Sequence, residues 1–244
     1  MMNKIPAFLL LFLFLVPIQA YATRTVTSPY VEKNVLKVKS KTGVTHDDER
    51  KSRDGAWAQK FAVEYGVTER FSMEAESDLE NAGDDNNTDM TALSLKGKVQ
   101  LTEKRKYWLD AGVRLTYEAG LTDDPDFLEI KALLTKDTED FRHMANFILT
   151  REVGQDAADE AEGGFSWSSR YKWMPEFEPG IEIYNNFGAL ADRPDFEDQD
   201  HSIGLVAYGK LGPHIKYEAG YLAGITENAA DGRLKAVIEY GIDF

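Results

Sequence analysis

Apolar residues recur at every second position in segments of about nine to twelve residues, separated by turn and loop residues. In the last segment, Leu234, Ile238 and Phe244 share one face, whereas Lys235 and Glu239 share the other. Side chains two positions apart lie on the same side of a strand, so this period predicts strands and not helices. Repetition of such strands along a whole chain is typical of a closed sheet in a membrane, with an apolar outside and a polar inside.

We predict an all-β chain: a transmembrane antiparallel up-and-down β-barrel of about twelve strands. The predicted strands cover residues 33–45, 55–66, 70–79, 91–101, 107–118, 126–136, 141–152, 165–174, 178–188, 201–211, 214–225 and 233–244.

The predicted connections alternate between short and long. The short ones are 67–69, 102–106, 137–140, 175–177 and 212–213, and the long ones are 46–54, 80–90, 119–125, 153–164, 189–200 and 226–232. Short periplasmic turns and long outer loops are typical of outer-membrane barrels, and an even number of strands brings both chain ends to the same side. A soluble β-sandwich does not need this alternation.

The N-terminus has the pattern of a cleavable signal peptide. Lys4 precedes an apolar run over residues 5–18, and Ala20 and Ala22 form a small-x-small cleavage site. The run is shorter than the roughly twenty residues that a spanning helix needs, although a retained anchor is the alternative. We therefore predict a signal peptide at 1–22, a short periplasmic lead at 23–32 and a single barrel domain at 33–244.

Composition removes several classes of function. The chain contains no cysteine, which excludes disulfides, thiolate metal sites and a lipid-modified N-terminal cysteine. Its formal net charge of −14 argues against nucleic acid as a partner, because a phosphate backbone requires clustered cations. No other apolar stretch is long enough for a membrane helix.

Strand parity predicts which charged side chains face the lumen, since a charge at the bilayer midplane would be costly. The predicted lumen-lining residues are Lys37, Lys39, Lys60, Glu64, Glu74, Lys96, Lys98, Asp110, Arg114, Glu118, Glu129, Lys131, Arg170, Lys172, Glu182, Lys210, Lys216, Glu218, Lys235 and Glu239. One interpretation is a polar conduit with a mild preference for anions. The other is a lattice of cross-strand salt bridges that fills a narrow lumen.

The predicted long loops are acidic. Their carboxylates are Glu80, Asp84, Asp85, Asp89, Asp156, Asp159, Glu160, Glu162, Asp192, Asp195, Glu197, Asp198 and Asp200. We expect no cofactor, but oxygen-rich loops of this kind are candidate sites for Ca²⁺ or Mg²⁺, or for lipopolysaccharide bridged by such cations. None has the spacing of a calcium loop, so ordinary solvated loops are the simpler interpretation.

Some outer-membrane barrels are hydrolases, which makes an enzyme the third hypothesis. His201, beside Asp198 and Asp200, is the histidine best placed for acid/base work at the outer rim. His143 and Ser169 are predicted to lie on neighbouring strands, toward the periplasmic half. The sequence has neither a Gly-x-Ser-x-Gly elbow nor a His-Glu-x-x-His helix. We therefore expect a protein that is not an enzyme.

Two resemblances to known proteins support the barrel. The alternate residues Ile238, Tyr240, Ile242 and terminal Phe244 resemble the C-terminal signal that the barrel-assembly machinery recognises in outer-membrane proteins. The stretches at 177–182, 201–204, 208–210 and 216–221 resemble proteobacterial outer-membrane barrels of a poorly characterised, transporter-like type, some of them linked to degradation of aromatic compounds. That family implies no active residues that can be transferred to this chain.

The leading hypothesis is therefore a Gram-negative outer-membrane barrel that acts as a channel or transporter for a small solute and contacts membrane lipid and lipopolysaccharide. The rival hypothesis is a structural or surface-interaction barrel with a plugged lumen.

Overall fold

The computed structural model describes residues 24–83, 87–121, 125–154, 157 and 160–244. The predicted signal peptide and the loop residues Asp84, Asp85, Asp156 and Asp159 lie outside the described residues. Among the described residues, no helix is both long and apolar enough to cross a bilayer.

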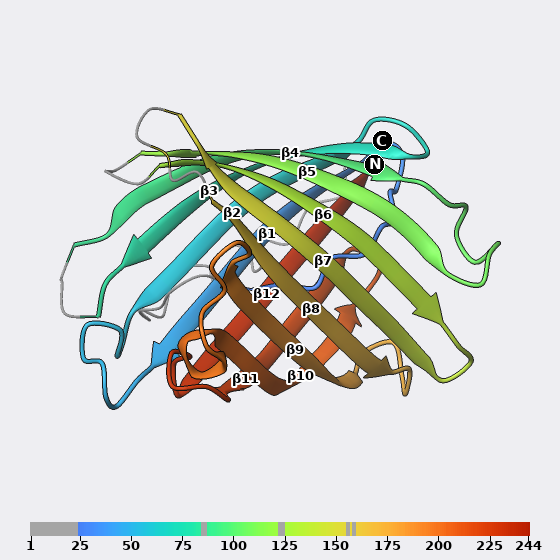
Figure 1. Cartoon of the computed structure of the whole chain (residues 1–244). Helices are drawn as coiled ribbons and strands as arrows, with labels where there is room; N and C mark the ends of the chain where they lie inside the picture. Colours follow the sequence, from blue (N-terminus) through green and yellow to red (C-terminus); the bar gives the residue numbers. More distant parts are fainter. Residues whose placement is uncertain (1–23, 84–86, 122–124, 155–156, 158–159) are drawn as a thin grey trace.

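The chain folds into a closed antiparallel barrel in which each strand pairs with its neighbours in sequence (Figure 1). The strands are β1 (Val35–His46), β2 (Trp57–Gly66), β3 (Phe71–Asn81), β4 (Asp89–Gln100), β5 (Asp110–Gly120), β6 (Asp126–Asp137), β7 (Phe141–Val153), β8 (Ala161–Tyr171), β9 (Glu178–Ala189), β10 (Asp200–Leu211), β11 (Ile215–Gly224) and β12 (Gly232–Asp243). The barrel closes where β1 pairs with β12, from Val35 opposite Asp243 to His46 opposite Gly232. The predicted closed barrel of twelve antiparallel strands is confirmed.

Most strand boundaries agree with the prediction to within three residues, and β8 differs most. It covers Ala161–Tyr171, whereas the alternation predicted 165–174. The register of β8 shifts between Gly163 and Gly164, where the sequence has two glycines in succession. Because glycine has no side chain, the alternation of apolar and polar residues gives no indication of which face these two positions occupy in the bulge.

The two faces of the barrel have opposite chemistry. Leu205 is 72% exposed and Leu115 is 52% exposed on the outside, whereas Glu64 and Lys96 are only 5% and 6% exposed on the inside. A soluble protein would place these residues the other way round. The arrangement is that of a barrel whose outer surface contacts hydrocarbon.

The two ends of the barrel differ in their connections. At the turn end, the connections are 67–70, 101–109, 138–140, 172–177 and 212–214, and β1 begins and β12 ends there. At the loop end, they are 47–56, 82–88, 121–125, 154–160, 190–199 and 225–231. The alternation is not strict, because 101–109 is longer than 121–125. This longer turn is built around Arg105, which has a positive φ of 60° and donates its backbone N–H to Asp110.

The N-terminal segment, residues 24–33, passes through the inside of the barrel (Figure 1). Arg24 pairs with Asp200 near the loop end, and Tyr30 donates a hydrogen bond to Asp110 near the turn end. The chain then turns at Asn34, whose N–H donates to Gly66 at 2.8 Å, and continues as β1. Residues 23–32 were expected to be a periplasmic lead, but the structure places residues 24–32 against the inner wall.

Candidate functional site: the barrel interior

One wall of the interior, formed by β1 to β4, is an ionic lattice. Lys39 Nζ lies 2.5 Å from a carboxylate oxygen of Glu64 and 2.5 Å from one of Glu74. Lys98 reaches Glu64 at 2.8 Å, and Lys96 reaches Glu74 at 3.2 Å. These residues come from four adjacent strands at inward positions, so the strand period itself builds the lattice.

The lattice continues toward the loop end. Lys41 and Lys96 both pair with Glu76, and Lys60 pairs with Asp78. Each of these ions is held by an opposite charge, because an isolated ion in this poorly solvated wall would be costly.

The adjoining stretch of wall, formed by β9 to β12, holds a compact network around Glu182, which is fully buried. Glu182 accepts hydrogen bonds from the hydroxyls of Tyr184 at 2.9 Å and Tyr208 at 2.6 Å, and from Lys235 at 2.8 Å. Lys235 also lies 3.2 Å from Glu218. The carboxylate of Glu182 thus connects β9, β10 and β12, and Lys235 adds β11 through Glu218.

The N-terminal segment is held inside the barrel by side chains of the wall. Asn146 makes two bonds of 2.8 Å to Thr27, one to its backbone N–H and one to its carbonyl oxygen. Tyr30 donates to Asp110 at 2.7 Å, and the N–H of Val31 donates to the side chain of Gln100 at 3.0 Å.

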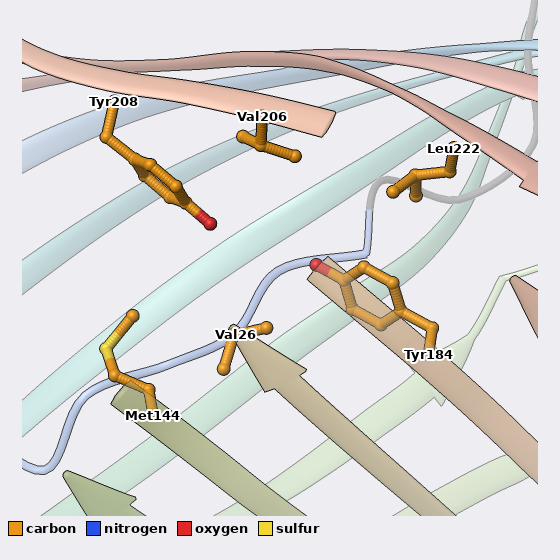
Figure 2. Packing of buried hydrophobic residues seen from close by; sticks show 6 residues of the cluster. All are labelled: Val26, Met144, Tyr184, Val206, Tyr208 and Leu222. Atoms are coloured by element: carbon orange, nitrogen blue, oxygen red, sulfur yellow. The ribbon is translucent and has the colours of Figure 1, made fainter. Parts of the chain in front are cut away.

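An apolar cluster surrounds Val26 inside the otherwise polar lumen. The side chains of Val26, Met144, Tyr184, Val206, Tyr208 and Leu222 converge there, and all six are buried (Figure 2). Val26 is contributed by the segment that crosses the lumen, and the other five by the barrel wall. Burying a valine side chain stabilises the segment by about 1.5–3 kcal/mol.

Gly112 allows the segment to approach the wall. A Cβ atom at this position would lie 2.7 Å from Cβ of Pro29, which is closer than such atoms come in real structures. The absence of a side chain on this part of β5 therefore makes room for the backbone of the segment.

A cavity of about 520 Å³ remains beside the segment. Its cationic lining residues are Lys37, Lys39, Lys41, Lys96, Lys98, Lys104, Arg105, Arg114, Arg142, Arg170, Lys172, Lys210 and Lys216. Its carboxylates are Glu32, Glu64, Glu74, Glu178, Glu218 and Glu239. Cations thus outnumber carboxylates clearly, although the whole chain is acidic.

Lys104 and Lys210 supply part of this excess. Among the described residues, neither has a carboxylate at ion-pair distance. Lys104 Nζ instead lies 4.6 Å from the centre of the Tyr30 ring. Partial burial and the nearby charges of Arg142 and Arg105 hold the pKa of Lys104, in the turn 101–109, below its usual range. A positive charge placed in this way favours an anion in the cavity.

The structure places the predicted lumen-lining residues at inward positions of the strands, except Lys172, which lies in the connection 172–177 and lines the cavity from the turn end. Those that line the cavity are Lys37, Lys39, Glu64, Glu74, Lys96, Lys98, Arg114, Arg170, Lys172, Lys210, Lys216, Glu218 and Glu239. The others make polar contacts with interior groups: Lys60, Asp110, Glu118, Glu129, Lys131, Glu182 and Lys235.

Sequence reasoning missed several residues of this interior. Lys41, Asp78, Tyr184 and Tyr208 lie at inward positions of β1, β3, β9 and β10, and their parity with predicted neighbours could have identified them. The segment 24–33 gave no usable signal, because it has no strand period and is held by bonds to side chains distant in sequence.

The terminal strand carries the predicted assembly residues on the outer face. Ile238 is 55% exposed and Phe244 is 76% exposed, with Tyr240 and Ile242 at the alternate positions between them. Their recognition by an assembly machinery stays a prediction.

The histidines considered for catalysis lie in packed surroundings. His201 is 3% exposed, stacks on Phe196 with ring centres 4.9 Å apart and lies 3.1 Å from a side-chain oxygen of Gln199. His143 pairs across strands with Ser169, as predicted, and stacks between Phe141 and Trp167. Within the described part of the chain, neither ring has a carboxylate partner to orient it.

The described acidic loops bring three potential cation ligands together. His46, Asp48 and Asp231 lie at the loop end, all exposed, with ligand atoms within 4.8 Å of one another. Asp54 also contacts His46 at 2.9 Å. The backbone N–H of Asp47 and the ring of His46 hold the pKa of Asp54 below its usual range. Binding of Ca²⁺ or Mg²⁺ to the loops stays a prediction.

Comparison with known proteins gives a fold but no sequence family. No family model and no curated protein matches the chain. A solved outer-membrane channel from Pseudomonas putida F1 is 12% identical with a TM-score of 0.59, over 92% of this chain and 100% of that one. The NanC porin is 10% identical with a TM-score of 0.58, over 85% and 100% of the two chains. The KdgM porin in complex with oligogalacturonate is 8% identical with a TM-score of 0.56, over 84% and 98%. The chain is therefore similar in fold to bacterial outer-membrane channels and porins.

Proposed function

We propose that this protein is an outer-membrane channel for small anionic solutes. The observation that carries the proposal is the cavity beside the N-terminal segment, in which cations outnumber carboxylates. Charges that line a conduit select ions of the opposite sign, and they act strongly where water is scarce.

The proposed setting follows from the two faces of the barrel. The apolar outside contacts membrane lipid, the turn end lies in the periplasm and the acidic loop end faces the medium and its lipopolysaccharide. The barrel-assembly machinery inserts the chain after export through the inner membrane and removal of residues 1–22. The similarity in fold to solved channels, one of them in complex with oligogalacturonate, supports a conducting barrel.

A plugged structural barrel is the second candidate, because residues 24–33 and the ionic lattice occupy much of the interior. The cavity of about 520 Å³ argues for the channel, since it is large enough to hold a small solute. The two candidates differ in whether ions pass.

The test is the conductance of refolded residues 23–244 in a planar bilayer, with a KCl gradient to read ion preference. We expect steady conductance with a reversal potential that indicates preference for chloride. The double variant Lys104→Met/Lys210→Met should conduct with a weaker preference, because it removes two cations without carboxylate partners. Lys51→Met is the matched control, since Lys51 is exposed in the connection 47–56 and does not line the cavity.

A correctly folded barrel that is silent under all conditions would overturn the proposal and favour the plugged barrel. A cation preference in the wild type, or an equal loss of preference in Lys51→Met, would show that the cavity lysines do not select the solute.

A further inference from the structure

The N-terminal segment is attached to the barrel through side chains and not through the sheet. In the described residues 24–31, its polar contacts to the wall run through side chains such as Asn146, Asp110 and Gln100. The first backbone bonds occur at the turn end, from Val35 N–H to Glu32 and from Asn34 N–H to Gly66. The segment could therefore leave the lumen without breaking any pairing between strands.

The loop-end contact can be released without leaving an isolated charge. Arg24 pairs with Asp200, but Asp200 also receives two hydrogen bonds from Arg233, at 3.2 Å and 3.0 Å. When Arg24 leaves, Asp200 keeps a bidentate partner, and Arg24 can be solvated. The high cost of breaking a buried pair, which arises from the ion left behind, does not apply here.

The same redundancy occurs at two other contacts. Asp110 accepts the hydroxyl of Tyr30, but it also accepts the backbone N–H of Arg105 at 3.0 Å and 2.9 Å to its two oxygens. The hydroxyl of Tyr184 lies 3.0 Å from the carbonyl oxygen of Arg24 and 2.9 Å from Glu182, so it keeps an acceptor when the segment moves. Asp200, Asp110 and Tyr184 thus keep polar partners when the segment leaves. The buried amide of Asn146 loses its two bonds to Thr27, and Lys37 loses Glu32 at 2.6 Å but keeps Glu239 at 4.0 Å.

The segment also lies where a solute would pass. Thr25, Val26, Thr27, Ser28, Tyr30 and Glu32 line the cavity together with the wall cations. Val26 fills the centre of the apolar cluster formed with residues of β7, β9, β10 and β11 (Figure 2). Withdrawal of the segment would widen the lumen along its length.

We propose that residues 24–33 are a gate, with Arg24 as its latch to Asp200 and with the turn at Asn34 as its hinge. The gate closes the lumen in the conformation described here and opens when the segment withdraws toward the turn end. Asn34 has a positive φ of 58° and begins the fixed part of the chain, so motion on its N-terminal side leaves β1 in place. This inference rests on the proposed function, that the barrel conducts.

The chain has no native cysteine, which allows a clean cross-linking test. The pair Val26→Cys/Met144→Cys joins the segment to β7 within the apolar cluster, using a short bifunctional methanethiosulfonate that dithiothreitol removes. We expect cross-linking to reduce conductance severalfold and reduction to restore it. The control pair Ile181→Cys/Leu205→Cys lies across β9 and β10 on the outer face, where cross-linking should leave conductance unchanged.

Two further variants measure the open state. Deletion of residues 24–31 should increase single-channel conductance severalfold, and Arg24→Gln should increase the fraction of time spent in the high-conductance level. Heat-modifiable migration on gels would show that each variant forms a folded barrel.

The outcomes separate the gate from the channel. If the wild type, the cross-linked pair and the deletion all conduct equally, the gate is wrong and the channel remains. If the wild type is silent and the deletion conducts, the gate is supported. If no folded variant conducts, the proposed channel fails and the gate fails with it.

Discussion

Replacing Glu64 by glutamine tests whether the ionic lattice stabilises the barrel. Glu64 is 5% exposed and accepts Lys39 at 2.5 Å, Lys98 at 2.8 Å and Ser72 at 2.7 Å. Lys39 keeps Glu74, whereas Lys98 has no other ion pair among the described residues. Stranding one buried cation costs about 3–5 kcal/mol, and water in the adjacent cavity should bring the loss toward about 3 kcal/mol.

The free energy of unfolding would be measured by urea titration in lipid vesicles, with tryptophan fluorescence as the signal. Glu64→Gln/Lys98→Met should recover to within about 1 kcal/mol of the wild type, because it removes the stranded charge. Glu69→Gln is the matched control, since Glu69 pairs with Lys33 at 3.1 Å on the exposed rim and should change stability by about 1 kcal/mol or less. A loss below 1 kcal/mol in Glu64→Gln, or no recovery in the double variant, would refute the reasoning.

Three further predictions concern the outside, the C-terminus and pH. Leu205→Arg should cost about 2–4 kcal/mol in the same titration, since Leu205 projects from the middle of β10, and unchanged stability would mean that this face does not contact hydrocarbon. Deletion of Phe244 should lower the amount of assembled barrel in outer-membrane fractions. The stability of the refolded protein should stay nearly unchanged, because the Phe244 side chain is exposed. Normal insertion of this variant would contradict an assembly role. Raising the pH should weaken the preference for anions, because the lowered pKa of Lys104 makes it lose its charge at a lower pH than ordinary lysines do. In Lys104→Met the change of reversal potential with pH should be smaller. Equal pH dependence of the reversal potential in the two proteins would exclude Lys104 as the cause.

The regular strands could be predicted from the sequence because their two faces have different solvents. At Glu64 the alternation is unambiguous, since Glu64 lies between Val63 and Tyr65, which both face outward. The prediction was least accurate at Gly163 and Gly164, where no side chain records the face, and in the turn 101–109, where Arg105 extends a connection expected to be shorter.

The residues that line the interior could be predicted from the sequence, but the contacts among them could not. Parity identifies Lys39, Glu64 and Glu74 as inward residues, but not which of them pair, because pairing depends on the stagger between strands. The network around Glu182 joins neighbouring strands through the hydroxyls of Tyr184 and Tyr208. Strand parity places these two tyrosines inside the barrel but does not identify Glu182 as their hydrogen-bond partner.

The sequence by itself determined the strands, their number and the chemistry of each face, because these depend on local period and on the contrast between lipid and lumen. Only the tertiary structure decided what fills the lumen. The segment 24–33 is held through contacts such as Thr27 with Asn146 and Arg24 with Asp200, between residues far apart in the chain. No local pattern encodes such contacts, since they exist only once barrel closure has brought the inner wall around the segment.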